Sequence, residues 1–198
     1  YISCGTWALL GAELNTPVIN PETEKVPFTN EGGLDGKIRF LTNIMGSWLL
    51  QETRRHWNES GRNLSFADLE KMALAAIPGQ FRINPAAPDF LAPGDMPARI
   101  KAYCEQNGQG VIPDDNTLLR TIYDSLALSF SEYFDKLEAI LGCKLPHIHL
   151  VGGGTKDTLL MQLTADASRR TVTAGPTEAT AIGNLLGGRQ GMIIALVF

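Results

Sequence analysis

The sequence predicts an α/β domain, and three patterns in its second half indicate this class. Apolar residues at helical spacing run through residues 115–141, which predicts one long helix. Residues 147–151 alternate as a strand and stop at the glycine run 152–154, after which leucines return at helical spacing. A second strand over 170–173 and a second helix through about residue 186 follow. The order strand, helix, strand, helix predicts a crossover unit with parallel strands.

Length and composition bound the class of protein. The chain has 198 residues, of which 44% are hydrophobic and 19% are charged, as is typical of one folded domain of roughly 100–200 residues. The formal net charge is −4 and no cluster of basic residues alternates with aromatic ones, which argues against nucleic acid as a partner. No apolar run reaches the ~20 residues of a transmembrane helix, and no signal peptide opens the chain, which argues against a membrane.

The cysteines point to a reducing compartment. Cys4, Cys104 and Cys143 are odd in number, widely spaced and without a CxxC motif. This pattern is typical of free thiols, because disulfides persist mainly in oxidising compartments. We therefore expect a cytoplasmic protein.

The first residues predict two strands joined by a short tip. Residues 1–4 and 7–14 are apolar runs, and Gly5-Thr6 separates them. A Gly-Thr tip offers backbone N–H groups and one hydroxyl to an anion, although a simple turn is the alternative. Residues 15–34 contain several prolines and glycines, so we expect mostly loop there.

The next stretch, residues 37–57, has helical spacing. Its apolar residues share one face, and Asn43, Ser47 and Gln51 fall four apart on the opposite side. We expect these three side chains to form a polar strip on one helix. An ordinary solvated face is the alternative interpretation.

The middle of the chain predicts further helices. Ser65 with Asp68 resembles a capping box that opens a helix to about residue 77. The turn-rich segment 78–97 includes a short edge strand at 81–83, and a helix over 97–106 ends at Asn107-Gly108. The long helix that follows is expected to be the packing spine of the domain. Along the last helix, small residues and Pro176 at its first position predict close packing on the sheet.

The glycine run Gly152-Gly153-Gly154 is the first candidate for a ligand site. A strand that ends in glycines and restarts as a helix presents bare N–H groups, where a phosphate or a nucleotide can approach closely. A ligand-free turn is the alternative. His147 and His149 lie on one strand face as zinc ligands can, but no third ligand is near, so we interpret both as structural. The chain has no Walker motif, no GxGxxG and no defensible Ser-His-Asp order.

Read together, six segments resemble the C-terminal, nucleotide-binding half of the FGGY carbohydrate kinases, and within that family the rhamnulokinases. The resemblance covers residues 1 to about 186, and its combination of motifs is highly specific. The segments are SCGTW (3–7), TNEGG (29–33), RFLTNIMGSWLLQ (39–51), DSLAL (124–128), VGGG (151–154) and AGPTEATAIGN (174–184).

The resemblance implies a ribonuclease-H-like (actin-like ATPase) domain, a mixed sheet flanked by helices, that closes on a sugar-binding domain around MgATP and a ketose. The implied reaction converts ATP and L-rhamnulose to ADP and L-rhamnulose 1-phosphate. Thr6 matches the threonine that meets the nucleotide phosphates, Asn43 and Gln51 match polar nucleotide-site residues, and Gly153 matches the glycine beside the adenosine. Gly5, Gly152, Gly154 and Asp157 complete the expected site for ATP and Mg²⁺.

Three departures limit what the resemblance transfers. The family's catalytic aspartate and first phosphate loop lie upstream of the Gly-Thr motif, so we expect no catalytic residue or metal ligand here and no kinase activity from this chain alone. Asp157 stands where the family usually has Asn, which replaces an amide that can donate by an acceptor-only carboxylate. Residues 1–187 match the ATP-binding domain, residues 188–198 form an atypical or truncated tail, and the N-terminal sugar-binding domain is not in this chain.

Other functions remain open at this point. A kinase for another ketose, such as L-fuculose or xylulose, shares the motifs, because most sugar contacts belong to the other domain. An actin- or Hsp70-like module uses the same fold without sugar chemistry, and a purely structural domain is a third option. The TNEGG and AGPTEATAIGN segments favour the kinase.

Overall fold

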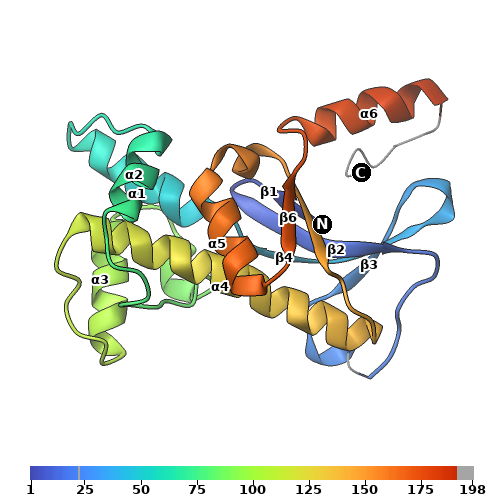
Figure 1. The fold of residues 1–198 in the computed structure, drawn as a ribbon, viewed down its shortest axis with the longest axis horizontal. Helices are drawn as coiled ribbons and strands as arrows, with labels where there is room; N and C mark the ends of the chain where they lie inside the picture. The colour runs from blue at the N-terminus through green and yellow to red at the C-terminus, as the bar shows by residue number, and fades with distance from the viewer. Residues whose placement is uncertain (22, 191–198) are drawn as a thin grey trace.

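The computed structural model describes residues 1–21 and 23–190 and confirms an α/β domain built on a mixed sheet (Figure 1). Within these residues the sheet has six strands in the order β3-β4-β2-β1-β5-β6. The strands are β1 (Ile2–Cys4), β2 (Trp7–Leu14), β3 (Thr29–Gly32), β4 (Ile38–Met45), β5 (His147–Val151) and β6 (Thr171–Ala174).

The sheet changes from antiparallel to parallel at β1. Strand β2 runs antiparallel to both β1 and β4, and β3 runs antiparallel to β4. Strand β1 pairs in parallel with β5, and β5 pairs in parallel with β6. The parallel pairs confirm the predicted crossover unit, in which α5 connects β5 to β6.

The long helix α4 is the spine of the domain. It runs lengthwise beside the sheet, α5 packs across it, and α1, α2 and α3 gather around one of its ends (Figure 1). The buried side chains of α4 pack with those of β2 and β5 in one hydrophobic core. Its bounds match the prediction, and its ends are fixed by Asp114, which caps the first turn, and by Gly142, which closes the last turn in the left-handed conformation. The helices are α1 (Trp48–Glu59), α2 (Phe66–Leu74), α3 (Met96–Gln106), α4 (Asp115–Leu141), α5 (Thr158–Ser168) and α6 (Ala179–Gln190).

The predicted helix over residues 37–57 is wrong in its first half. Residues 38–45 form β4, which pairs along its whole length with β2, and the helix α1 begins only at Trp48. Leu41 and Met45 are buried on one face of the strand, and Phe40 and Ile44 are buried on the other. A strand buried on both faces has a nearly continuous apolar run, which cannot be told from a helix by periodicity alone.

Residues 15–34 are mostly loop as expected, with the short strand β3 near their end. Two smaller predictions fail, and the first concerns residues 81–83, which form no strand. Helix α6 begins at Ala179 rather than at Pro176, and Ala181 and Leu185 are exposed, so close packing on the sheet is wrong for that side of the helix. The expected atypical tail lies outside the described residues from position 191 onward.

Two expectations about the environment can be compared with the structure. Cys4, Cys104 and Cys143 are free thiols, of which only Cys143 is exposed. Among residues 1–21 and 23–190, no helix combines the length and the apolar character needed to cross a membrane.

Candidate nucleotide site

The tip between β1 and β2 rests on the start of α1. The carbonyl oxygen of Gly5 accepts hydrogen bonds from the backbone N–H and the hydroxyl of Ser47, both at 2.8 Å. The carbonyl of Thr6 accepts from the backbone N–H of Trp48 at 3.2 Å. A Cβ at Gly46 would meet the Gly5 carbonyl oxygen, so only glycine allows this close approach of two backbones.

Side chains extend this contact into a chain of hydrogen bonds. The Thr6 hydroxyl donates to Oε1 of Gln51 at 3.0 Å, and Nε2 of Gln51 donates to Oγ of Ser47 at 2.7 Å. Thr6 is exposed, while Ser47 and Gln51 are half-buried. The structure therefore brings together Gly5, Thr6, Ser47 and Gln51.

Asn43 lies on β4 and not on the helix that carries Ser47 and Gln51. It is exposed and stands opposite Leu9 of β2, on the sheet face that also carries Trp7. The prediction of one helical strip through Asn43, Ser47 and Gln51 is therefore wrong, because strand β4 ends between the first two. The glycine at position 46 was the available signal for this break.

The glycine run after β5 packs against the residue that precedes the hairpin tip. A Cβ at Gly152 would lie 2.8 Å from the carbonyl oxygen of Cys4, and a Cβ at Gly154 would lie 2.7 Å from the Cys4 sulfur. Gly152 also has φ = 86°, which favours glycine. Gly153 differs from both neighbours, since a Cβ there would have no atom within 4 Å. Gly152 and Gly154 thus allow the loop to pack on Cys4, whereas the backbone at Gly153 is open to a ligand.

Cys4 itself is a packing residue. Burial, followed by the nearby charge of Asp157, raises the pKa of its thiol to about 12. The thiol therefore stays protonated at neutral pH and is a poor nucleophile. The sequence does not predict this role, because nothing in a single cysteine indicates that it joins two glycine-bearing loops.

Asp157 is held by the protein on both oxygens. Its Oδ1 accepts from the backbone N–H of Leu160 at 2.9 Å and so caps α5, and its Oδ2 accepts from the hydroxyl of Tyr123 at 2.7 Å. Burial raises the pKa of this carboxyl, and the two hydrogen bonds oppose that shift. The carboxylate therefore links α5 to α4.

No cluster of three or more His, Cys, Asp or Glu side chains suited to a metal ion occurs in the described part of the chain. His147 is exposed and His149 half-buried, on the same side of β5. Burial, followed by the charge of the N-terminus, lowers the pKa of His149. The two features that fit a polyanion are the Thr6 hydroxyl and the open backbone at Gly153.

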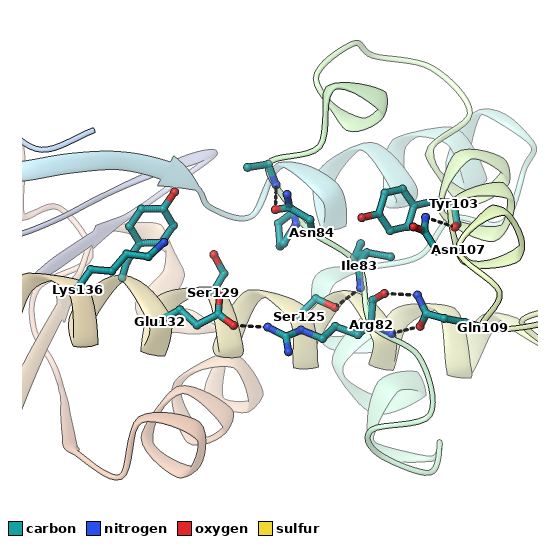
Figure 2. A pocket seen from close by; sticks show the side chains of 13 residues that line it. Arg82, Ile83, Asn84, Tyr103, Asn107, Gln109, Ser125, Ser129, Glu132 and Lys136 are labelled. Atoms are coloured by element: carbon teal, nitrogen blue, oxygen red, sulfur yellow. Dashed lines mark hydrogen bonds and ion pairs between the residues drawn. The ribbon is translucent and has the colours of Figure 1, made fainter. Parts of the chain in front are cut away.

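A separate cavity of about 490 Å³ lies beside α4, between that helix, the segment 82–86 and the end of α3 (Figure 2). Arg82 forms an ion pair with Glu132, and Ser125 holds the backbone of Ile83 at 3.0 Å. None of the residues predicted for the nucleotide site lines this cavity. The segment predicted as an edge strand forms one of its walls instead.

Known proteins match this chain over most of its length. The model of the FGGY family of carbohydrate kinases, C-terminal domain, matches residues 1–189. A rhamnulokinase from Bacteroides thetaiotaomicron is 42% identical over 186 residues, covering 94% of this chain and 38% of the relative. A rhamnulokinase from Enterococcus faecalis is 45% identical over 188 residues, covering 94% of this chain and 37% of the relative. The chain thus spans little more than a third of the length of these relatives.

Solved structures confirm the fold. The xylulose kinase from Bifidobacterium adolescentis matches with a TM-score of 0.61 and 19% identity, covering 88% of this chain and 33% of that protein. The xylulose kinase from Rhodospirillum rubrum matches with a TM-score of 0.61 and 16% identity, covering 89% of this chain and 34% of that protein. The predicted ribonuclease-H-like, actin-like fold is therefore present. The chain belongs to the FGGY family of carbohydrate kinases and matches their C-terminal domain.

Proposed function

We propose that this chain is the nucleotide-binding part of an ATP-dependent sugar kinase that converts L-rhamnulose to L-rhamnulose 1-phosphate. One observation carries the proposal. The Gly5-Thr6 tip, the start of α1 and the open glycine loop after β5 lie far apart in the sequence but meet at one end of the sheet. Glycine-bearing loops at the end of a sheet, where a ligand can approach the backbone closely, are typical of phosphate sites in α/β proteins.

Each residue has a role in this proposal. Gly5 and Thr6 face the phosphates, Gly152, Gly153 and Gly154 lie beside the adenosine, and Asn43 and Gln51 supply polar contacts. Mg²⁺ neutralises the phosphate oxygens when MgATP is bound. The residues of this chain position the nucleotide, and a carboxylate outside the chain accepts the proton of the sugar hydroxyl.

The rhamnulokinase relatives support L-rhamnulose as the substrate. A kinase for L-fuculose or xylulose is the second candidate, favoured by the structural likeness to two xylulose kinases. ATP use and the free cysteines fit a cytoplasmic protein. The proposed partners are ATP, ADP and a sugar, and they include neither nucleic acid nor a membrane.

Two measurements test the proposal. Calorimetric titration of MgATP into this chain should show binding to one site, and absence of binding would remove the proposed nucleotide role. A coupled ADP-release assay should show turnover with L-rhamnulose only after the chain is joined to an N-terminal sugar-binding domain. Faster turnover with L-fuculose or xylulose would show that L-rhamnulose is not the substrate. Sugar-dependent turnover by this chain alone would contradict the expectation that it is inactive without the other domain.

A further inference from the structure

The chain of hydrogen bonds from Thr6 through Gln51 to Ser47 has a direction. In the structure each group donates to the next, since Thr6 donates to Gln51, Gln51 donates to Ser47, and Ser47 donates to the Gly5 carbonyl. A threonine hydroxyl carries only one hydrogen. In this direction Thr6 therefore has no hydrogen left for a ligand and can only accept.

Phosphate oxygens that are ionised accept hydrogen bonds and cannot donate them. A phosphate at Thr6 therefore needs the hydrogen that Thr6 now gives to Gln51. The two ends of a side-chain amide are nearly equal in shape, and the terminal torsion of glutamine is roughly two-fold. A half-turn of the Gln51 amide thus reverses the chain without moving its backbone.

The reversed chain leaves every group satisfied. Ser47 then donates to Oε1 of Gln51, Nε2 of Gln51 donates to Oγ1 of Thr6, and Thr6 donates outward. Turning the Ser47 hydroxyl removes one donor from the Gly5 carbonyl, but that oxygen keeps the backbone N–H of Ser47 at 2.8 Å. The hairpin tip therefore stays on α1 in both directions.

Resting on the proposed nucleotide site, we propose that Gln51 and Ser47 are positioning residues that turn Thr6 from an acceptor into a donor when a phosphate group binds. The recognised group is the phosphate of a nucleoside phosphate. Adenosine, which has no phosphate, binds without the reversal.

The test is a double-substitution cycle read by calorimetry with ADP, and with adenosine as the ligand without phosphate. Glutamate at position 51 accepts but cannot donate to Thr6, so Gln51→Glu keeps Thr6 as the donor to position 51. Thr6→Val removes the hydroxyl and leaves only the effect of the added charge. We expect Gln51→Glu to weaken ADP binding about three- to tenfold more in the Thr6 protein than in the Thr6→Val protein, the range of one hydrogen bond.

Controls separate the outcomes. Ser47→Ala removes the hydroxyl that must donate to Gln51 in the reversed chain, and it should weaken ADP binding about two- to threefold, part of one hydrogen bond, while leaving adenosine binding unchanged. An equal effect of Gln51→Glu on ADP binding in both backgrounds would overturn the reversal while leaving the nucleotide site intact. Failure of the unchanged protein to bind either ligand would overturn the nucleotide site and the reversal together. Thermal unfolding of each variant shows whether its fold is kept.

Discussion

Two carboxylates, Asp157 and Glu138, help to tie helix α4 to the β5-α5-β6 unit, and these two contacts respond to protons in opposite ways. Near the glycine loop, Asp157 accepts the hydroxyl of Tyr123 at 2.7 Å. Near the other end of α4, Glu138 pairs with Arg170 at 3.0 Å. The two contacts differ in the partner, which is neutral for Asp157 and charged for Glu138.

Hydrogen bonds, two of them from cations, hold the pKa of Glu138 low. Burial raises this pKa, but hydrogen bonds from Lys144, the Leu145 N–H and Arg170 outweigh burial and lower it to about 2. The side chains of Glu138 and Arg170 are only 6% and 8% exposed, whereas that of Lys144 is 89% exposed. We therefore assign most of the stabilising contact to Arg170, because an exposed ion pair contributes little.

The neutral partner leaves Asp157 in the opposite situation. Burial is the largest influence and raises its pKa, and the hydrogen bonds from Leu160 and Tyr123 do not cancel it. Burial also raises the pKa of Tyr123, which keeps its hydroxyl a donor. A carboxylate that ties α4 to the β5-α5-β6 unit is thus favoured in its ionised form when a buried cation lies beside it, as at Glu138. It is disfavoured in that form when its partner is neutral, as at Asp157.

The largest effect is expected at Glu138. Glu138→Gln removes the charge that pairs with the buried Arg170, although Asp135 still pairs with Arg170 at 2.8 Å. Breaking a buried pair typically costs 3–5 kcal/mol, and the remaining partner should reduce this to about 2–3 kcal/mol in the free energy of unfolding. Urea denaturation at pH 7 measures the difference, and a change below about 0.5 kcal/mol would contradict the importance of the pair.

The same variant tests the sign of the pH dependence. Glu138 has a folded-state pKa of about 2, below its unfolded value of roughly 4.3. Its contribution is therefore complete above about pH 5 and is lost as the pH falls toward 2. The stability difference between the unchanged protein and Glu138→Gln should shrink over this interval, and a constant difference would contradict the account.

A smaller effect is expected from Tyr123→Phe. This change leaves the half-buried carboxylate of Asp157 without one of its two donors, which should destabilise the fold by about 1–2 kcal/mol. Tyr133→Phe is the matched control, because its hydroxyl makes no hydrogen bond to the described residues, and it should stay within about 0.5 kcal/mol. Equal losses in both variants would show that ring packing, and not the hydroxyl, explains the effect.

The smallest change in stability is expected from Asp157→Asn. The amide oxygen can still cap Leu160 and the amide nitrogen can donate to Tyr123, while the buried charge is removed. We expect a change within about 0.5 kcal/mol at pH 7, with any advantage of Asn shrinking on acidification, because the raised pKa of Asp157 opposes folding only while the group is ionised.

Asp157→Asn also bears on the nucleotide. It introduces the amide that the resemblance to the family implies at this position, and in the longer enzyme it should tighten ATP binding by up to about tenfold, the equivalent of ~1.4 kcal/mol. Calorimetric titration of ATP into both proteins measures this. Equal or weaker binding by the Asn variant would show that Asp157 does not oppose the nucleotide.

The sequence predicted the elements whose pattern is local. Asp115–Leu141 was found because one helical face and a closing Gly142 are visible in the sequence, and the crossover followed from the order of elements. Strand β4 was missed because both of its faces carry buried apolar residues, which only the pairing with β2 and β3 explains. The contact of Tyr123 with Asp157 was missed because no local signal joins residues on separate helices.

The candidate site was predicted in its parts but not in its contacts. Resemblance named Thr6, Gln51 and Gly153, and the structure adds that Gln51 joins Thr6 to Ser47 and that Gly46 allows the hairpin tip to approach the start of α1. Cys4 was not foreseen, because its role depends on two glycines that lie far along the chain.

The central claim is that the nucleotide lies over the open backbone at Gly153, and Gly153→Leu tests it most directly. A Cβ at this position meets no atom within 4 Å, so the fold should accept the side chain while the nucleotide should not. Gly32→Leu is the matched control, because it too has open space around it and lies on the edge strand β3. By calorimetry with MgATP, we expect Gly153→Leu to lose at least about tenfold in affinity, or ~1.4 kcal/mol, with an unchanged melting temperature, and Gly32→Leu to bind normally. Normal MgATP binding by a folded Gly153→Leu protein would contradict the placement of the nucleotide.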